Sequence, residues 1–371
     1  MSVIESTHED HGATFGERDG RTIVEHFGRP ERTHRAVRNG VGLLESAYGV
    51  IVVEGDDRLE YVDNVVSNRV PQTDGQGCYA LVLDPQGGIE VELYIYNAGE
   101  RLLLFVPPTE ARPLAEEWSE KVFIQDVEIR VATDEYAIFG VHGPQATEKV
   151  ASVLNGAASP DECYSFVRGT MGDEGVTVIR TDALTGEESF EVVCAADDAE
   201  AVYDTLLTQG MNAAPFGYRT WDTLTLEAGS PLFGTELAGT IPNVLGLRNA
   251  LDFEKGCYVG QEVVSRVENR GQPSRKLVGL TLEPEPGDAG SEAAVPEPGA
   301  AVFDGDASVG EITRADESPM LEDVIALAIV EFDLESDAVT VRVGGEETPA
   351  TRTELPFVDG SDRSDRLPAY Q

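Results

Sequence analysis

The chain has 371 residues, of which 41% are hydrophobic, and its 27 basic and 68 acidic side chains give a formal net charge of −41. This length exceeds what one hydrophobic core usually covers, so we expect two or three domains. No apolar run approaches the roughly 18 residues of a membrane-spanning helix. Because no basic stripe is present to neutralise phosphates, nucleic-acid binding by a broad basic surface is also disfavoured.

The acidic residues run through the whole chain, and only four of the basic residues are lysines. Such a charge makes the compact state repel itself in dilute buffer. In roughly molar salt the Debye length falls to about 3 Å and the repulsion is screened. The composition therefore predicts a salt-adapted cytoplasm, such as that of a haloarchaeon. An acidic interaction tail is the alternative, and the even spread of the acidic residues disfavours it.

The four cysteines lie far apart, at positions 78, 163, 194 and 257, with no C-x-x-C pair. This spacing argues against a metal site on the chain and against a disulfide framework. The polar N-terminus, Met1 to Thr22, lacks the apolar segment of a secretory signal. Both features favour a reducing cytoplasm.

In chain order, residues 1–30 are predicted to be a loosely ordered tail. A helix is expected from Arg32 through Leu44, a strand over 49–54 and a second helix over 59–66. Three apolar runs follow, at 79–83, 90–96 and 102–106, with a hairpin turn at Asp84–Gly88 and a helix over 110–121. A meander followed by a helix predicts an α+β layer and not a doubly wound parallel sheet. Neither a dinucleotide-binding glycine motif nor a P-loop occurs.

A second unit repeats this style, with strands at 135–140, 176–180 and 190–193 and helices at 199–207 and 218–227. After Arg275 the pattern changes to short runs at 277–282, 300–303, 326–332 and 338–343, which predict a small β-barrel or sandwich. The expected organisation is a region over 31–272, made of two α+β units at about 31–130 and 131–272. A barrel over 273–357 and a tail over 358–371 follow.

The densest polar stretch is Lys255-Gly-Cys-Tyr-Val-Gly-Gln-Glu262. Gly256 and Gly260 permit backbone torsions that a β-carbon would block. The stretch lacks the period of a helix or strand, and we expect a polar loop held by a rigid scaffold. The alternative is an ordinary turn in which Cys257 packs as a small buried hydrophobe.

This stretch closely resembles the K-G-C-Y/F-x-G-Q-E signature of the YgfZ family. Members are folate-binding proteins implicated in iron–sulfur cluster assembly or repair, in the same superfamily as the glycine-cleavage T-protein, an aminomethyltransferase. The resemblance runs from about Arg32 to Phe357. It implies two ferredoxin-like α+β units of the T-protein type around a central folate cavity, closed by a C-terminal β-barrel. The other matching segments are 185–191, 226–229, 232–237 and 241–242.

The resemblance also implies site residues for tetrahydrofolate or a related pterin. Glu191 corresponds to a carboxylate that binds the pterin, and one carboxylate can accept two hydrogen bonds side by side from the N–C(NH2)–N edge. From the residues alone, an outward-facing, solvated strand carboxylate is the favoured interpretation of Glu191, and the resemblance favours the ligand-binding one. The further residues assigned to folate binding are Tyr258, Gln261, Arg219 and Glu92.

Two departures from the T-proteins bear on activity. T-proteins carry G-G-I-x-D-D, in which one Asp is essential for methylene transfer, and here Val91 and Glu92 replace the two Asp residues. Because valine can neither accept a proton nor stabilise an iminium cation, this change puts transferase chemistry in doubt. The T-protein arginine before the matching L-E-A-G segment aligns with Trp221, and Arg219 lies two residues away.

Two hypotheses follow. In the first, the protein supports iron–sulfur cluster assembly or repair through tetrahydrofolate and Cys257, whose thiol pKa Lys255 would lower; its partners would be iron–sulfur client proteins. In the second, it is an aminomethyltransferase that passes a one-carbon unit to tetrahydrofolate, with glycine-cleavage subunits as partners. The intact Cys257 motif and the valine at 91 favour the first hypothesis. The T-protein length and the Leu226–Gly229 segment favour the second.

Overall fold

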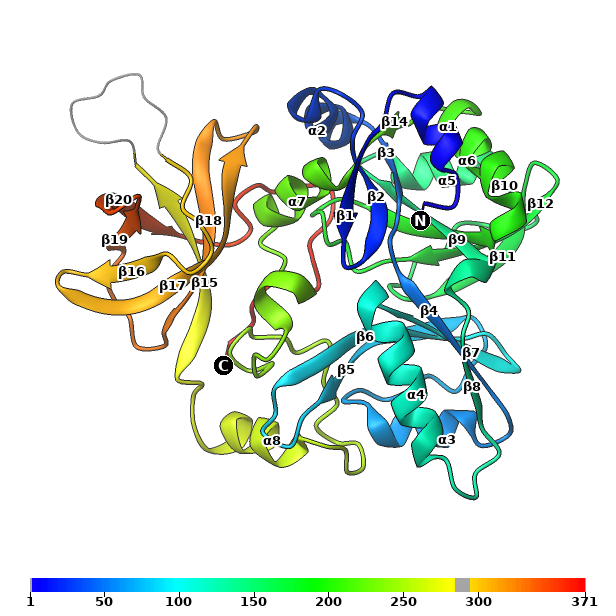
Figure 1. Ribbon diagram of the computed structural model, residues 1–371, viewed down its shortest axis with the longest axis horizontal. Helices are drawn as coiled ribbons and strands as arrows, with labels where there is room; N and C mark the ends of the chain where they lie inside the picture. Colours follow the sequence, from blue (N-terminus) through cyan, green and yellow to red (C-terminus); the bar gives the residue numbers. More distant parts are fainter. Residues whose placement is uncertain (1, 284–293, 371) are drawn as a thin grey trace.

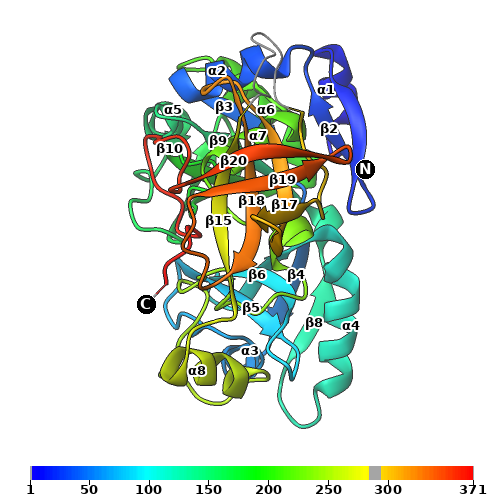
Figure 2. The same ribbon diagram turned by 90° about the vertical axis from the view of Figure 1, so that its left-hand side faces the viewer.

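The computed structural model describes residues 2–283 and 294–370, and shows two antiparallel-rich sheets with flanking helices beside a closed β-barrel (Figure 1). Turned by 90°, the barrel lies in front of the two sheets (Figure 2). The predicted α+β fold with a C-terminal barrel is confirmed. In the described part of the chain, no helix is long and apolar enough to cross a bilayer.

The first sheet has five strands in the order β5-β6-β7-β4-β8. Its alternating residues divide between two cores. Val91, Leu93 and Ile95 of β6 pack under α3 and α4, whereas Tyr94 and Tyr96 face the interior of the molecule. The elements are β4 (Gly49–Glu54), α3 (Arg58–Val65), β5 (Gln76–Leu83), β6 (Ile89–Asn97), β7 (Arg101–Val106), α4 (Ala111–Lys121) and β8 (Glu128–Val131).

The second sheet has seven strands in the order β10-β11-β12-β13-β9-β3-β14. Helices α5 and α6 cover one face, where Phe190, Val192 and Cys194 of β13 are buried, and the other face looks toward the first sheet. The elements are β3 (Gly42–Glu45), β9 (Tyr136–His142), α5 (Ala146–Val153), β10 (Leu154–Asn155), β11 (Phe166–Met171), β12 (Glu174–Arg180), β13 (Ser189–Ala195), α6 (Ala199–Thr208) and β14 (Ala214–Pro215).

The helix expected to reach Leu44 ends earlier, because α2 spans Pro30–Asn39 and residues 42–45 form β3. Gly40 leaves the helical conformation at φ −155°, and β3 then pairs with β9. A strand from the beginning of the chain therefore belongs to the second sheet. The two units consequently interleave, whereas a division near residue 130 was expected.

Residues 1–30 were expected to be loose, but they form α1 (Glu5–Asp10) and a hairpin of β1 (Thr14–Arg18) and β2 (Arg21–His26). A buried ion pair holds α1, since Nε2 of His8 lies 2.8 Å from Oε2 of Glu45. Burial opposes ionisation of Glu45, but the bonds from His8 and Ser2 keep its pKa below the usual value. Such a contact between distant residues has no local sequence signal.

The barrel closes in the order β15-β18-β17-β16-β19-β20 around its own apolar core. Helix α7 (Tyr218–Glu227) lies between the barrel and the second sheet (Figure 1). The barrel strands are β15 (Arg275–Leu282), β16 (Ala301–Asp304), β17 (Ala307–Ser318), β18 (Asp323–Glu331), β19 (Ala338–Val343) and β20 (Glu346–Thr353).

A buried polar network joins α2, α7 and the barrel at Glu227. Its Oε2 lies 2.9 Å from Nε2 of His34 and 2.7 Å from Nη2 of Arg38, and its Oε1 accepts a hydrogen bond of 2.6 Å from Ser318. Arg38 also pairs with Glu187 at 2.8 Å. Two of the segments that carry the family resemblance, around Glu187 and Glu227, therefore hold the fold together.

Residues 358–370, which we call the C-terminal strap, were expected to be a tail but pack back into the molecule. The red trace in Figure 1 runs from the barrel past the sheets toward β15. Tyr370 accepts a hydrogen bond of 2.7 Å from Leu277 N and donates one of 2.7 Å to Val244 O. The backbone N of Asp365 donates to Asp182 O at 3.1 Å. The strap therefore links the barrel to both sheets.

Candidate active site

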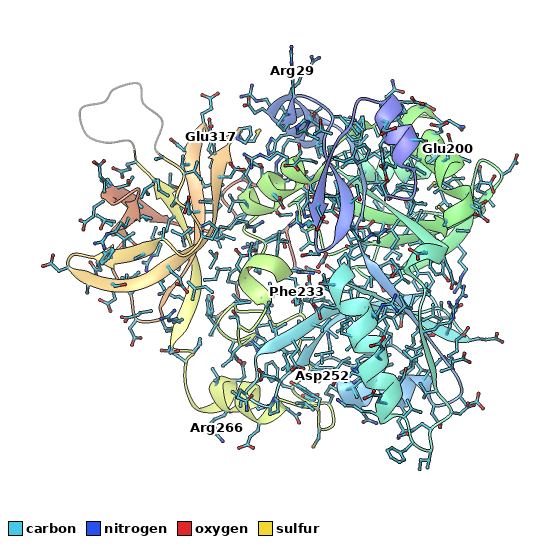
Figure 3. All side chains as sticks on the ribbon, in the orientation of Figure 1. Arg29, Glu200, Phe233, Asp252, Arg266 and Glu317 are labelled. Atoms are coloured by element: carbon cyan, nitrogen blue, oxygen red, sulfur yellow. The ribbon has the colours of Figure 1, made fainter. Side chains whose placement is uncertain are left out.

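The interior faces of the two sheets and the β1–β2 hairpin enclose a cavity with about 710 Å³ of empty space, open solvent included. Phe233, labelled near the centre of Figure 3, lines it from a short helical segment, Phe233–Leu237, beside β6. Ring-bearing and charged side chains share the wall. They include Arg18, Tyr48, Glu92, Tyr94, Phe105, Tyr218, Trp221, Phe233 and Arg366.

A smaller recess adjoins this cavity, with about 280 Å³ of empty space, open solvent included, and shares Tyr48, Tyr94, Leu184 and Trp221 with it as lining residues. The recess adds polar side chains from the second sheet and the segment after β12. These are His142, Thr181, Asp182 and Glu191. The cavity is thus wide at the hairpin and ends in a narrow polar recess.

Glu191 lies at the inner end, on the inward-facing side of β13. It is 3% exposed, and the hydroxyls of Ser46 and Tyr48 donate to its carboxyl oxygens at 3.0 and 3.3 Å. Burial raises the pKa of Glu191 to about 8, and the two hydroxyl bonds offset only part of that rise. The alternative of a solvated outward carboxylate does not hold. At neutral pH the free protein holds this group largely protonated.

The two residues that replace the paired Asp of the T-proteins face opposite sides of β6. Val91 is 6% exposed and packs in the core under α3 and α4. Glu92 lines the cavity, where it accepts a hydrogen bond of 2.9 Å from Tyr79 and lies 2.7 Å from Nη1 of Arg366. Side chains alternate along a strand, so the cavity-facing position keeps a carboxylate. The valine therefore does not remove the acid from the cavity.

Arg366 of the C-terminal strap supplies a buried cation to the cavity wall, in addition to Arg18. Its side chain is 1% exposed, its Nε lies 3.1 Å from Asp182, and its guanidinium lies 4.3 Å from the centre of the Tyr79 ring. Tyr94 donates to the same Asp182 carboxylate at 2.8 Å. Neither Arg366 nor Asp182 was expected in the site from the sequence. For Asp182 a signal exists, because it follows a buried strand and precedes the 185–191 segment; Arg366 has none.

The Lys255–Glu262 segment lies elsewhere. Nζ of Lys255 donates to the carbonyls of Asp63, Val66 and Asn68 at 2.5–2.9 Å, so its ammonium serves to hold the loop. Asp252, which accepts from the backbone N of Lys255, lies below Phe233 in Figure 3, as does Arg266 of α8 (Gln261–Arg270). No residue of the segment lines the cavity or its recess.

The predicted ligand-binding residues therefore separate into two groups. Glu92 lines the cavity and Glu191 lines its recess, but Tyr258 is buried in the core and Gln261 begins α8. Arg219 is exposed on α7 and pairs with Asp316 of the barrel at 3.1 Å. Trp221, two residues further along α7, is the residue that lines the cavity. One helical turn cannot present both positions to the same side.

The four cysteines are all free, and their surroundings differ. Burial raises the pKa of Cys78 and of Cys194 to about 12. Cys163 is exposed as a residue, but its thiol donates to Thr181 O at 3.3 Å, and desolvation of the sulfur and the nearby Asp182 carboxylate raise its pKa. Cys257 is exposed. Over residues 2–283 and 294–370, no cluster of three His, Cys, Asp or Glu side chains could hold a metal ion.

The fold and the cavity define a protein built of two facing α+β layers, a closed barrel and a carboxylate-bearing pocket between them. Residues 4–255 match the GCVT N-terminal domain, and residues 275–359 match the glycine cleavage T-protein C-terminal barrel domain. The chain belongs to the glycine cleavage T-protein family.

Relatives match over nearly the full length. The aminomethyltransferases of Saccharopolyspora erythraea and Streptomyces coelicolor are each 30% identical to it, with 96% of this chain covered and 97% and 96% of theirs. The crystal structure of the glycine cleavage system aminomethyltransferase T from Bartonella henselae superposes with a TM-score of 0.83 over 98% of both chains, at 23% identity. That structure supports the fold alone.

Proposed function

We propose that this protein transfers a one-carbon unit from an aminomethyl donor to tetrahydrofolate, as the names of its relatives indicate for them. The observation that carries the proposal is the placement of Glu92 in the cavity and of Glu191 in the recess that shares four lining residues with it. This placement favours the transferase hypothesis over a role in iron–sulfur cluster assembly. The doubt about transferase chemistry came from Val91, whose side chain faces away from the cavity.

The residues present fit a flat, donor-rich heterocycle. Tyr48 stacks on Phe105 with ring centres 5.4 Å apart, and Tyr94 and Trp221 complete an aromatic wall. A flat heterocycle would pack favourably against these rings. At the inner end, the two oxygens of Glu191 would accept the paired donors of the pterin edge. The tetrahydrofolate tail would then extend toward the wider mouth, where Arg18 of the hairpin lies.

In this proposal Glu92 is the carboxylate beside the transferred carbon. A carboxylate there would stabilise the positive charge that develops as the aminomethyl group loses ammonia, and would take up a proton. Arg366 and Tyr79 fix its orientation. The donor would be presented by glycine-cleavage subunits, and the reaction would take place in the cytoplasm, where free thiols such as these four persist.

The test is one-carbon transfer measured with purified wild type and Glu92→Gln in molar salt. Loss of the carboxylate should lower the rate by about 10²–10⁴-fold, the usual contribution of a positioned acid or base. Glu90→Gln is the matched control, because Glu90 is exposed on the same strand. Transfer at the wild-type rate by Glu92→Gln would contradict the role assigned to Glu92.

A second candidate is the accessory function in iron–sulfur cluster assembly or repair, which belongs to a YgfZ-type protein. One observation favours it: Cys257 is exposed, whereas Cys78 and Cys194 are buried and the exposed Cys163 donates its thiol proton to Thr181 O. In this case Cys257 should be alkylated faster than the others, and Cys257→Ser should fail to restore iron–sulfur enzyme activity in a deletion strain. Full rescue by Cys257→Ser, with no selective labelling, would remove this candidate.

A further inference from the structure

His142 brings an unpaired lone pair to the recess that holds Glu191. The side chain lies at the end of β9, is 2% exposed, and has its Nδ1 3.0 Å from the Ser189 hydroxyl. That hydroxyl has a single proton, which it donates to Glu187 O at 2.7 Å. Ser189 can therefore only accept from His142, so the proton of the imidazole sits on Nδ1.

The other ring nitrogen must then be an acceptor. Burial lowers the pKa of His142 to about 3, so the ring is neutral and Nε2 carries a lone pair. This atom is inaccessible to solvent and has no hydrogen-bond partner among the described residues. The neighbouring rings are Phe216 and Trp221, with centres 5.8 and 5.2 Å away, which offer packing. Buried acceptors are nearly always paired, so a donor from outside the chain is expected here.

Gly140 shows where the lone pair lies. A β-carbon on Gly140 would stand 2.4 Å from Nε2 of His142 and 3.2 Å from Oγ of Ser46. Ser46 is the residue that donates to Glu191 at 3.0 Å. The absence of a side chain at 140 thus leaves room for the imidazole beside the Ser46–Glu191 pair. His142 and Glu191 also line the same small recess.

We propose that His142 is a specificity-determining residue that reads the oxidation state of the bound pterin, accepting a hydrogen bond from a ring N–H. This inference rests on the proposed function. Glu191 takes the N–C(NH2)–N edge, which is the same in every oxidation state. Outside that edge, N5 and N8 bear hydrogens in tetrahydrofolate, only N8 does in 7,8-dihydrofolate, and both are lone pairs in folate. A lone pair facing Nε2 would be repelled, whereas an N–H would satisfy it.

The experiment is anaerobic calorimetric titration of wild type, His142→Phe and His142→Gln with tetrahydrofolate, 7,8-dihydrofolate and folate. Wild type should prefer tetrahydrofolate to folate by about tenfold or more, as sites built around a ligand N–H reject analogues that lack it. In His142→Phe the ratio of the affinities for tetrahydrofolate and folate should fall toward one. His142→Gln retains an acceptor oxygen and should keep part of the preference, and it serves as the test if the phenylalanine variant does not fold.

Glu191→Gln is the matched control, because it should weaken all three ligands by a similar factor and leave their ratio unchanged. Nitrogen-15 spectra give a second readout: Nε2 of His142 should show an unprotonated signal that moves when tetrahydrofolate binds. An unchanged ratio in both His142 variants would overturn the inference. So would an equal loss for all three ligands, which would mean that His142 accepts from the exocyclic amino group. Wild type that binds none of them would instead overturn the proposed function itself.

Discussion

Replacing Glu191 by glutamine should stabilise the ligand-free protein at high pH. The folded state raises the pKa of this carboxyl from 4.5 to about 8 because it is buried. A raised pKa means that the stability contributed by the protonated form is fully present below pH 4.5 and is lost as the pH rises through 8. At 1.36 kcal/mol per pKa unit the loss reaches at most about 5 kcal/mol. Glutamine has the same shape and no proton to lose, so it escapes this cost.

The assay is denaturant unfolding of wild type and Glu191→Gln from pH 5 to pH 9 at constant high salt. The difference in the free energy of unfolding should be smallest at pH 5 and should grow in favour of glutamine up to about pH 9. Glu100→Gln, at an exposed position, controls for the general loss of one negative charge. If the Glu191→Gln curve runs parallel to wild type across the range, the reasoning from burial is refuted.

The remaining predictions concern binding, the strap and the charge. Glu191→Gln should weaken tetrahydrofolate binding by about 1–3 kcal/mol, since the amide NH2 of glutamine would face the N–H donors of the pterin. The affinity of the wild type should rise toward pH 8 as the Glu191 carboxyl ionises. An affinity that does not depend on pH would count against this. Arg366→Gln should lower the free energy of unfolding by about 3–5 kcal/mol, because Glu92 and Asp182 lose their cation. Arg363→Gln, at an exposed strap position, is the control. An equal loss of stability in the two variants would contradict the role of the buried ion pairs. Because −41 charges must be screened, the melting temperature should fall as salt is diluted below molar; circular dichroism that shows a constant melting temperature would disprove the salt requirement.

Strand alternation explains much of what the sequence could and could not predict. The apolar runs located most strands correctly, but they could not show whether the face of β13 that carries Glu191 is solvated or covered by the first sheet. The same rule applies to Val91 and Glu92, but a residue-by-residue comparison ignores which face each position occupies. A shift of one residue along a strand reverses the face. Whether a cavity keeps its carboxylate therefore depends on which face of the strand each residue occupies, as well as on the aligned residue types.

Contacts between distant residues account for the rest. Lys255 was expected to act on Cys257 because the two are neighbours in sequence, but three backbone carbonyls of residues 63–68 compete for the ammonium and bind it. Strands β17 and β20 were missed because their solvent-facing residues are polar and their inward residues are small or widely spaced. A role for His142 could not be predicted from the sequence, because it depends on the two hydrogen bonds of the Ser189 hydroxyl, which only the folded structure shows.

The position of Arg366 also sets an order in which the molecule can be completed. Its contacts with Asp182 and Tyr94 span 184 and 272 residues. During synthesis both sheets and the barrel have left the ribosome before residue 366 does. Until then Glu92 and Asp182 stand in an apolar setting without a counter-charge, so the two layers cannot close tightly around them. Docking of the strap is therefore expected to be a late step of folding, because its contacts close long loops.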